Sequence, residues 1–318
     1  MFDKLNQNVA LKIDDTVILN KQHVEAYIVK NPQLFEDIIF TEHLNYHMNY
    51  GYNKLNNPVK IGYLGDEIQR IIIKTNDYPK KRLKVNLIYD GSSYHGFQIQ
   101  SNTVTIQGEL SKLISEVNNK EVLVQGASRT DAEVHAKMQV IHFDDESSLT
   151  NEEWLRFLNN RLPKSIWVTK VESVHPLFHS RYDVYEKQYL YKIKLGDYDP
   201  FLLNYTWNID YLDFVKLNDQ LKKIIGTHDF TSFAKGIKGD NIRTIYQSGY
   251  KLDDDILEIY ISGNGFLRYM VRLIIAHVIR YATNKTDLDI LEVLNEKSRK
   301  NTKELAPAGG LYLNKIIY

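Results

Sequence analysis

Apolar residues recur along this chain with two different periods. Between residues 134 and 143 they stand at nearly every second position, with His135, Lys137, Gln139 and His142 interleaved, which is the pattern of a half-buried strand. Other apolar segments predict further strands at 15–19, 25–29, 67–74, 84–89, 166–174, 189–193 and 256–262. The loop before residue 134 is therefore expected to lead into a sheet.

The second period, of three to four residues, predicts helices. Apolar residues from Ile106 to Val117 share one face, and Thr105 ahead of them suits an N-cap. Thr150 and Glu153 form the pattern of a capping box for a second helix, which Pro163 ends. Further helices are expected at 33–40, 210–226 and 266–281. The last is apolar on most sides and should be buried.

Composition narrows the class of protein. The 318 residues are 43% hydrophobic, which is ample for more than one core. We find no run near the roughly 18 apolar residues of a membrane span and no signal peptide, so a soluble protein is expected. The absence of cysteine excludes disulfides and thiolate chemistry and fits a cytoplasmic location. Lysine plus arginine equal aspartate plus glutamate, 40 against 40, so any basic surface must be local.

The loop that leads into the strand at 134–143 carries the most concentrated candidate chemistry. Asp131 stands directly behind Arg129 and Thr130. The small residues at 126–128 let another backbone or a ligand come close. Taken alone, Arg-Thr-Asp is more often a turn, because Asp and Thr side chains form local hydrogen bonds. The loop is thus either a turn or a site at the lip of a cleft.

Several longer blocks decide between these alternatives, because together they resemble the TruA family of pseudouridine synthases. In chain order they read YDGSSYHGFQIQ, GASRTDAEVHAKMQVIHF, FHSRYDVYEKQYLYKI, GTHDFTSFAKG, IRTIY, GNGFLRYMVR and ELAPAGGLYLNKIIY. They cover roughly residues 84 to 318. The resemblance implies an α/β (α+β) protein with two pseudo-symmetric lobes, each an antiparallel sheet backed by helices, around a basic central cleft. It also implies a homodimer.

The resemblance also implies which residues do the chemistry. Asp131 matches the family's catalytic nucleophile, and Arg272 matches the arginine placed against it. Tyr189 matches the tyrosine that lies against the target base. Arg129 matches the arginine that fills the gap left by a flipped nucleotide, since a base in a stem must be extruded before it can react.

The reaction itself can be argued from its bonds. Isomerisation of uridine breaks the N1–C1′ bond, turns the ring and rejoins it at C5, so it calls for a nucleophilic carboxylate and a proton acceptor. Asp131 would attack either C1′ or the uracil ring. Arg272 would favour the ionised carboxylate, because a cation within about 4–6 Å stabilises the charged form. No cofactor is required, and no metal is expected because the histidines lack ligand-like spacing.

Basic residues in and between the family blocks are expected to contact RNA phosphates. They are Arg181, Lys187, Lys235, Lys238, Arg243 and Arg268. The alternative is a solvated charged face. Arg268, Arg272 and Arg280 are expected on one ridge of the helix at 266–281, where a buried guanidinium needs an acceptor.

We expect three units, with boundaries at 1–82, 83–180 and 181–318. The second and third are the N-terminal and C-terminal lobes of the synthase core, and the catalytic loop belongs to the second. The first is an N-terminal extension in which aromatic and basic residues alternate between His43 and Lys60. Such residues could stack on single-stranded RNA. A packing surface with polar rims is the alternative, so the extension is either an RNA-binding or an interface module.

The expected function is therefore an RNA pseudouridine synthase. Its partner is RNA, foremost the tRNA anticodon stem-loop at positions 38–40, and no membrane is involved. Ser128, Glu133 and Met138 stand where the family has glycine, which leaves the substrate more open than the reaction. The alternatives are a relative that modifies another RNA such as ribosomal RNA, a non-catalytic RNA-binding relative, and a glycosidase or nucleosidase with Glu133 as its second acid.

Overall fold

The computed structural model describes the backbone of residues 5–13, 16–19, 39–44, 48–52, 55–64, 67–73, 78–79, 81–236 and 240–318. Ahead of residue 81, side chains are described for 50–52, 55–60 and 78–79. The predicted strand at 25–29 lies outside the described residues. So does the predicted helix at 33–40, except for its last two residues, which belong to a strand and not to a helix.

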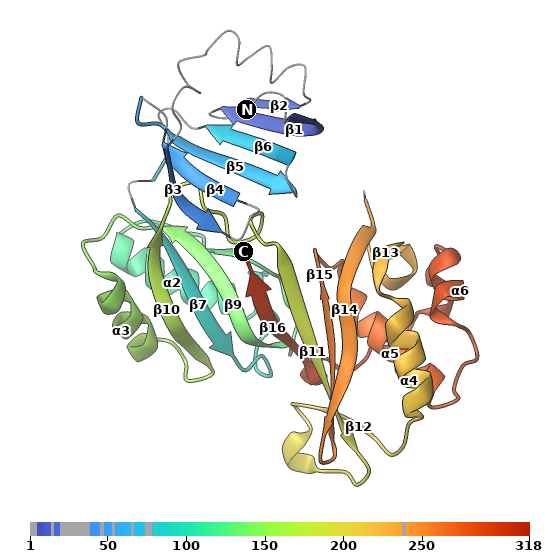
Figure 1. Cartoon of the computed structure of the whole chain (residues 1–318). Coiled ribbons are helices and arrows are strands. Elements are labelled where there is room, and N and C mark those ends of the chain that lie inside the picture. Colours follow the sequence, from blue (N-terminus) through green and yellow to red (C-terminus); the bar gives the residue numbers. More distant parts are fainter. Residues whose placement is uncertain are drawn as a thin grey trace.

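A mixed ten-stranded sheet forms the core of the molecule, in the order β10-β7-β9-β16-β11-β15-β14-β13, with β8 on β9 and β12 on β11 (Figure 1). The strands are β7 (Arg82–Tyr89), β8 (Gln125–Gly126), β9 (His135–Asp144), β10 (Ile166–Val174), β11 (Glu186–Leu195), β12 (Trp207–Ile209), β13 (Gly226–Asp229), β14 (Ile242–Asp253), β15 (Ile256–Gly263) and β16 (Leu311–Ile317). Together with the helices, this sheet confirms the expected α/β class.

Helices back both halves of this sheet. In the described residues they are α2 (Ile106–Asn118), α3 (Asn151–Arg161), α4 (Phe214–Lys223), α5 (Met270–Ala282) and α6 (Ile290–Asn295). The first two accompany β7, β9 and β10, which we call the N-terminal half of the core, and the others accompany β11 and β13–β15, the C-terminal half (Figure 1). None of these helices is long and apolar enough to cross a membrane.

The two halves join where β9 and β16 pair in parallel. Ala136, at the start of β9, pairs with Leu313, and Leu313 pairs in turn with Tyr189 of β11. This register brings Tyr189 level with the first residues of β9. The loop that precedes β9 therefore lies against the C-terminal half of the core.

Helix boundaries follow local signals at some ends and not at others. Thr105 caps α2, and Thr150 and Glu153 form the predicted capping box of α3. The predicted start of α4 at residue 210 is wrong, because the helix begins at residue 214 after the N-cap Asp213. The predicted start of α5 at residue 266 is wrong as well, because Tyr269 has a left-handed φ of +64° that cannot continue a helix.

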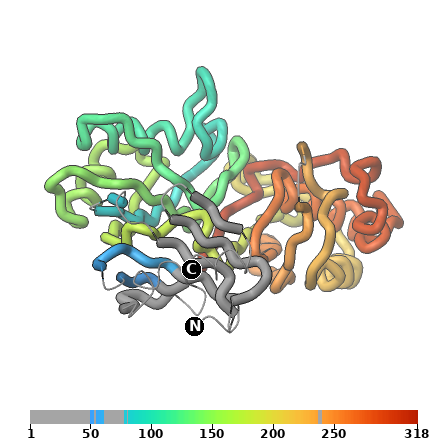
Figure 2. Tube along the Cα trace, turned by 90° about the horizontal axis from the view of Figure 1, so that it is seen from above, coloured from blue at the N-terminus to red at the C-terminus, as the bar shows by residue number. Residues whose placement is uncertain are grey.

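An N-terminal module precedes the core. Its six-stranded sheet has the order β2-β1-β6-β5-β4-β3. The strands are β1 (Leu5–Ile13), β2 (Thr16–Leu19), β3 (Ile39–Leu44), β4 (Met48–Tyr52), β5 (Pro58–Leu64) and β6 (Glu67–Ile73). Residues 50–52 and 55–60 lie beside the N-terminal half of the core in both views (Figures 1 and 2). The predicted strands at 15–19 and 67–74 correspond to β2 and β6.

Candidate active site

A cavity of about 700 Å³ opens between the two halves of the core. Residues 127–132 of the loop before β9 line one side of it, and β11 and residues 266–272 contribute the other lining. All four residues expected to do the chemistry line this cavity, namely Arg129, Asp131, Tyr189 and Arg272. Residues far apart in the sequence therefore meet at one place.

Hydrogen bonds hold the backbone of the Asp131 loop, which we define as residues 126–134. The fully buried side chain of Gln139 in β9 accepts a bond from the Ser128 amide at 3.2 Å and donates one to the Ser128 carbonyl at 2.7 Å. The hydroxyls of Tyr89 and Thr130 lie 2.8 Å apart. Breaking such buried bonds would leave polar groups unsatisfied, so the loop is held in one arrangement.

Two glycines after β7 let a second loop pack closely under the Asp131 loop. A Cβ on Gly91 would lie 2.1 Å from the carbonyl oxygen of Val134, and a Cβ on Gly96 would lie 2.7 Å from that of Thr130. Gly96 also has a φ of +90°, which favours glycine. Any side chain at either position would push the Asp131 loop away.

Glu133 keeps the backbone conformation that suits the glycine it replaces. Its φ is +65°, and its amide donates to the carbonyl of Tyr94 at 3.1 Å. For a residue with a Cβ, the left-handed conformation costs about 1–2 kcal/mol. The Glu133 side chain is exposed, and the residues that line the cavity here are its neighbours Ala132 and Val134. Glutamate in place of glycine at residue 133 therefore adds backbone strain to the Asp131 loop but leaves the backbone conformation as it would be with glycine.

Arg272 of α5 contacts the Asp131 carboxylate. Its Nη1 lies 3.4 Å from Oδ2 of Asp131, and its Nε donates to the carbonyl of Ala306 at 2.8 Å. The guanidinium thus bridges the Asp131 carboxylate and the carbonyl of Ala306, ahead of β16. Its contact with the carboxylate is through one nitrogen and is not bidentate. Arg268 was expected on the same helical ridge but lies before the first turn of α5.

Burial and charge act in opposite directions on Asp131. Burial raises the pKa of this carboxyl above its usual range, and the charges of Arg272 and then Arg268 lower it without cancelling the effect of burial. The side chain of Asp131 is 25% exposed and that of Arg272 is 13% exposed. Arg272 therefore favours the ionised carboxylate, as expected, but burial outweighs it.

Tyr189 is buried at the wall of the cavity. Its hydroxyl lies 2.9 Å from the Ser128 hydroxyl, and its ring packs edge-on against Phe266 with centroids 5.1 Å apart. Burial raises the pKa of Tyr189 to about 12, so the phenol stays protonated at neutral pH. A neutral aromatic ring held in place by Ser128 and Phe266 is suited to pack on a base.

Three of the six basic residues expected to contact RNA line the cavity. They are Arg181, Lys187 and Arg268. Lys187 donates to the carbonyl of Ala127 at 2.7 Å and so ties β11 to the Asp131 loop. Burial, with the nearby charges of Arg181 and then Arg243, lowers the pKa of Lys187 to about 8.

The other three basic residues do not line the cavity or lie outside the described residues. The ammonium of Lys235 lies 5.7 Å from the centroid of the Tyr269 ring. Arg243 of β14 donates to the backbone carbonyls of Asp240 and Ile242. Lys238 falls among residues 237–239, which the structure does not describe.

Tyr269 lines the cavity and was missed in the sequence. Arg268, Lys235 and Arg272 lie 5.0, 5.7 and 5.9 Å from the centroid of its ring. Tyr269 is the N-cap residue of α5 and has a left-handed φ of +64°. Tyr269 occupies an unspecified position of the family's F-L-x-x-M-V-R motif, so no sequence signal pointed to it.

In the part of the chain that the structure describes, no three His, Asp or Glu side chains are grouped as metal ligands would be.

Two segments of the chain carry all the residues that line this cavity except Lys187 and Tyr189 of β11. Residues 87–183 and 221–318 match the model of a family described as tRNA pseudouridine synthase, and these segments contain Asp131 and Arg272. The chain belongs to the tRNA pseudouridine synthase family. The expected enzyme class, an isomerase that converts uridine to pseudouridine, is thereby confirmed.

Relatives of similar length to the core extend this match. The chain is 41% identical over 244 residues to tRNA pseudouridine synthase A of Geobacillus sp. (strain WCH70), which covers 75% of this chain and 98% of that protein. It is 40% identical over 243 residues to tRNA pseudouridine synthase A 1 of Bacillus cereus (strain ATCC 14579), covering 74% and 98%. It is 38% identical over 240 residues to tRNA pseudouridine synthase A of Staphylococcus aureus (strain JH1), covering 74% and 90%. The resemblance to the TruA family is therefore confirmed.

Proposed function

We propose that this protein converts uridine to pseudouridine in tRNA, at positions 38–40 of the anticodon stem-loop, with Asp131 as the nucleophile. The observation that carries the proposal is the contact between the Asp131 carboxylate and Arg272, both of which line a cavity that Tyr189 also lines. The relatives named tRNA pseudouridine synthase A support tRNA as the substrate.

Each cavity residue has a role in this proposal. Asp131 attacks the uridine at C1′ or at the ring, and Arg272 favours the ionised carboxylate that this attack needs. Tyr189 packs on the detached uracil while the ring turns. Arg129 is exposed beside the nucleophile and is free to occupy the space of the extruded nucleotide.

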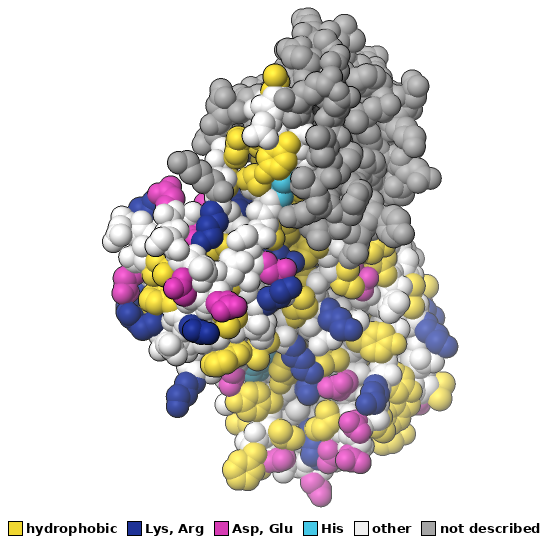
Figure 3. Space-filling model, turned by 60° about the vertical axis from the view of Figure 1, so that its left-hand side comes forward, with side chains coloured by type: hydrophobic (Ala, Val, Ile, Leu, Met, Phe, Trp, Pro, Cys, Tyr) yellow, Lys and Arg dark blue, Asp and Glu magenta, His cyan; other side chains and the backbone are white. Residues whose placement is uncertain are grey.

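A local concentration of positive charge supports an RNA substrate. The whole chain has no net charge, and on the face seen in Figure 3 acidic and basic side chains are interspersed. The cavity, in contrast, is lined by Arg129, Arg181, Lys187, Arg268 and Arg272 with Asp131 as its acidic residue. Phosphates flanking an extruded uridine would be neutralised there.

A glycosidase or nucleosidase requires a second positioned acid, and the candidate for it was Glu133. The side chain of Glu133 is exposed, and its neighbours line the cavity in its place. We therefore prefer the isomerase.

The proposal also includes a cytoplasmic location and a homodimer, and light scattering of the purified protein tests the dimer.

Substrate choice is tested with unmodified tRNA transcripts and the full-length protein. We expect pseudouridine at one or more of positions 38–40 and none when those uridines are replaced by cytidine. A ribosomal RNA fragment of similar length serves as the competing substrate. Modification of the ribosomal fragment alone would overturn the tRNA proposal, and release of free uracil would show a glycosidase.

A further inference from the structure

The N-terminal module contacts the core at a loop that also reaches the active cavity. This loop, residues 175–185, joins β10 to β11, and we call it the Arg181 loop. Arg181 at its apex is exposed and lines the cavity. The family match begins at residue 87, so the module is an addition to the matched core.

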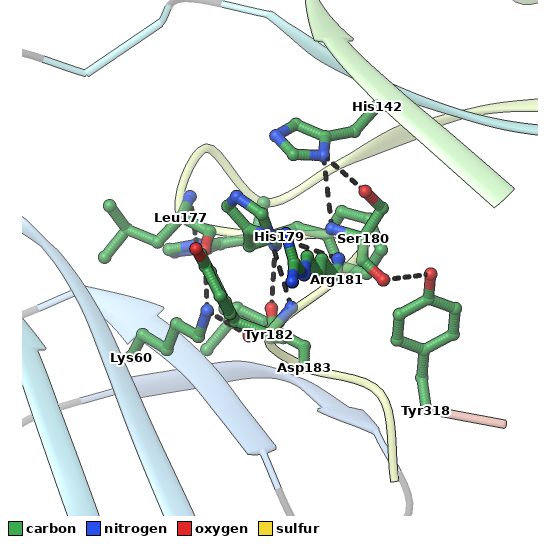
Figure 4. A network of polar contacts seen from close by, with 12 residues as sticks. Lys60, His142, Leu177, His179, Ser180, Arg181, Tyr182, Asp183 and Tyr318 are labelled. Carbon is green, nitrogen blue, oxygen red and sulfur yellow. Dashed lines mark hydrogen bonds and ion pairs between the residues drawn. The ribbon is translucent and has the colours of Figure 1, made fainter. Parts of the chain in front are cut away.

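Lys60 of β5 binds both ends of the Arg181 loop. Its ammonium forms an ion pair with the Asp183 carboxylate and donates to the carbonyl of Leu177 at 3.1 Å (Figure 4). The two charged side chains are 2% and 0% exposed. A buried pair tolerates little displacement, because separating the charges would leave each without a partner in a medium of low polarity. Lys60 therefore fixes the distance between the two ends of the loop.

Tyr50 and His175 widen this contact. The Tyr50 hydroxyl donates to the Asp183 carboxylate. The His175 ring lies 5.0 Å from the Tyr50 ring and 5.2 Å from the Tyr52 ring, and its Nε2 is 3.1 Å from the carbonyl of Gly51. Burial lowers the pKa of His175 to about 4, so the ring is neutral and donates this bond from Nε2. Tyr50 and Lys60 are thus buried packing residues and do not stack on RNA.

The core holds the Arg181 loop from the other side. The Ser180 amide donates to Nδ1 of His142 at 3.1 Å, and the Tyr318 hydroxyl donates to the Ser180 carbonyl at 2.7 Å (Figure 4). Within the loop, the His179 amide donates to Asp183 at 2.7 Å. Ser180 and Asp183, on either side of the exposed Arg181, are therefore both anchored, one by the core and the other by the module.

We propose that Lys60 and Tyr50 are positioning residues for RNA binding, which hold the Arg181 loop so that the guanidinium of Arg181 meets an RNA phosphate at the cavity. The inference rests on the proposed function. It assigns the N-terminal module a role in the active cavity without direct contact between Tyr50 or Lys60 and RNA. Because the loop is already ordered, the phosphate contact costs less conformational entropy on binding.

The test measures binding and turnover of an unmodified tRNA transcript by full-length Lys60→Met, Arg181→Ala and the double variant. We expect Lys60→Met to raise Kd and KM about fivefold and to lower the salt dependence of binding by about one phosphate contact. Its kcat should stay within about twofold, because the reacting groups are untouched. Since Lys60 acts through Arg181, the double variant should bind no more weakly than Arg181→Ala alone.

Two further variants keep the test independent of folding. Tyr50→Phe removes one hydroxyl from the same Asp183 contact and should give a smaller change of the same kind. Lys81→Met is the matched control, because Lys81 also bridges a carboxylate, Asp145, and a backbone carbonyl, that of Leu149. Neither Asp145 nor Leu149 lines the cavity, so Lys81→Met should lower the melting temperature and leave Kd unchanged.

Wild-type Kd and salt dependence in both Lys60→Met and Tyr50→Phe would overturn the inference. So would fully multiplicative effects of Lys60→Met and Arg181→Ala, because they would show that Lys60 does not act through Arg181. Failure of the proposed function is separate, since it would appear as an absence of pseudouridine with the wild-type protein. Should Lys60→Met not fold, Tyr50→Phe alone decides the matter.

Discussion

The hydroxyls of Ser128 and Tyr189 lie 2.9 Å apart and join the Asp131 loop to β11 across the active cavity. In the family pattern a glycine stands at the position of Ser128, so this bond is a property of the present chain. It complements the bond from Lys187 to the carbonyl of Ala127 one residue earlier. The ring that we propose for base packing is thereby fixed to the loop that carries the nucleophile.

Ser128→Ala is expected to lower the free energy of unfolding by about 1 kcal/mol, because the buried Tyr189 hydroxyl loses its partner. In a Tyr189→Phe background the same change should cost much less, since no phenol remains to be satisfied. Urea denaturation of the four proteins measures the coupling. Additive losses would mean that the two hydroxyls do not interact.

The Asp131–Arg272 contact predicts a shift in the pH dependence of the rate. The rate should fall as pH drops through the raised pKa of Asp131, because protonation removes the nucleophile. In Arg272→Leu the carboxylate stays buried but loses the cation, so its pKa rises further and the acid limb of kcat/KM moves to higher pH. Arg272→Lys should restore the profile in part.

Arg280→Leu is the matched control for this profile. Arg280 lies on the same helix but pairs with Glu304 at 2.9 Å on the surface. Its loss should leave the pH–rate profile as in the wild type. An unchanged profile in Arg272→Leu would separate Arg272 from the ionisation of Asp131.

The strained backbone at residue 133 predicts a stabilising substitution. Glu133→Gly should raise the free energy of unfolding by about 0.5–1 kcal/mol, because glycine adopts a φ of +65° without steric cost. Glu116→Gly, at an exposed site within α2, should lower it by about 1 kcal/mol. Thermal denaturation of both variants gives the two signs, and a loss of stability in Glu133→Gly would show that the loop is not strained there.

Local patterns predicted several elements well because their signals lie within a few residues. The capping box of Thr150 and Glu153 opens α3, and β10 spans the predicted residues 166–174. The start of α5 could not be predicted in this way. The left-handed φ of Tyr269 delays the start of α5 to residue 270. A tyrosine side chain gives no sign in the sequence that its backbone is left-handed.

The candidate site depended on long-range pairing. Tyr189 lies level with the start of β9, directly after the Asp131 loop, because it pairs with Leu313, which pairs with Ala136. No periodicity in the sequence specifies that register. The expectation that Tyr189 and Asp131 share one site came from the family motifs. The burial of Lys60 against Asp183 joins residues 123 positions apart and likewise had no local signal. The alternation of basic residues and tyrosines around Lys60 was compatible with RNA stacking and with packing.

The central claim is that Asp131 is the nucleophile of a pseudouridine synthase, and Asp131→Asn tests it most directly. Asparagine keeps the size of the side chain, so folding and binding of an unmodified tRNA transcript should be nearly those of the wild type. Pseudouridine formation, mapped on that transcript, should fall by more than about a thousandfold, because a neutral amide cannot attack. Turnover by Asp131→Asn within tenfold of the wild type, with binding retained, would contradict the claim.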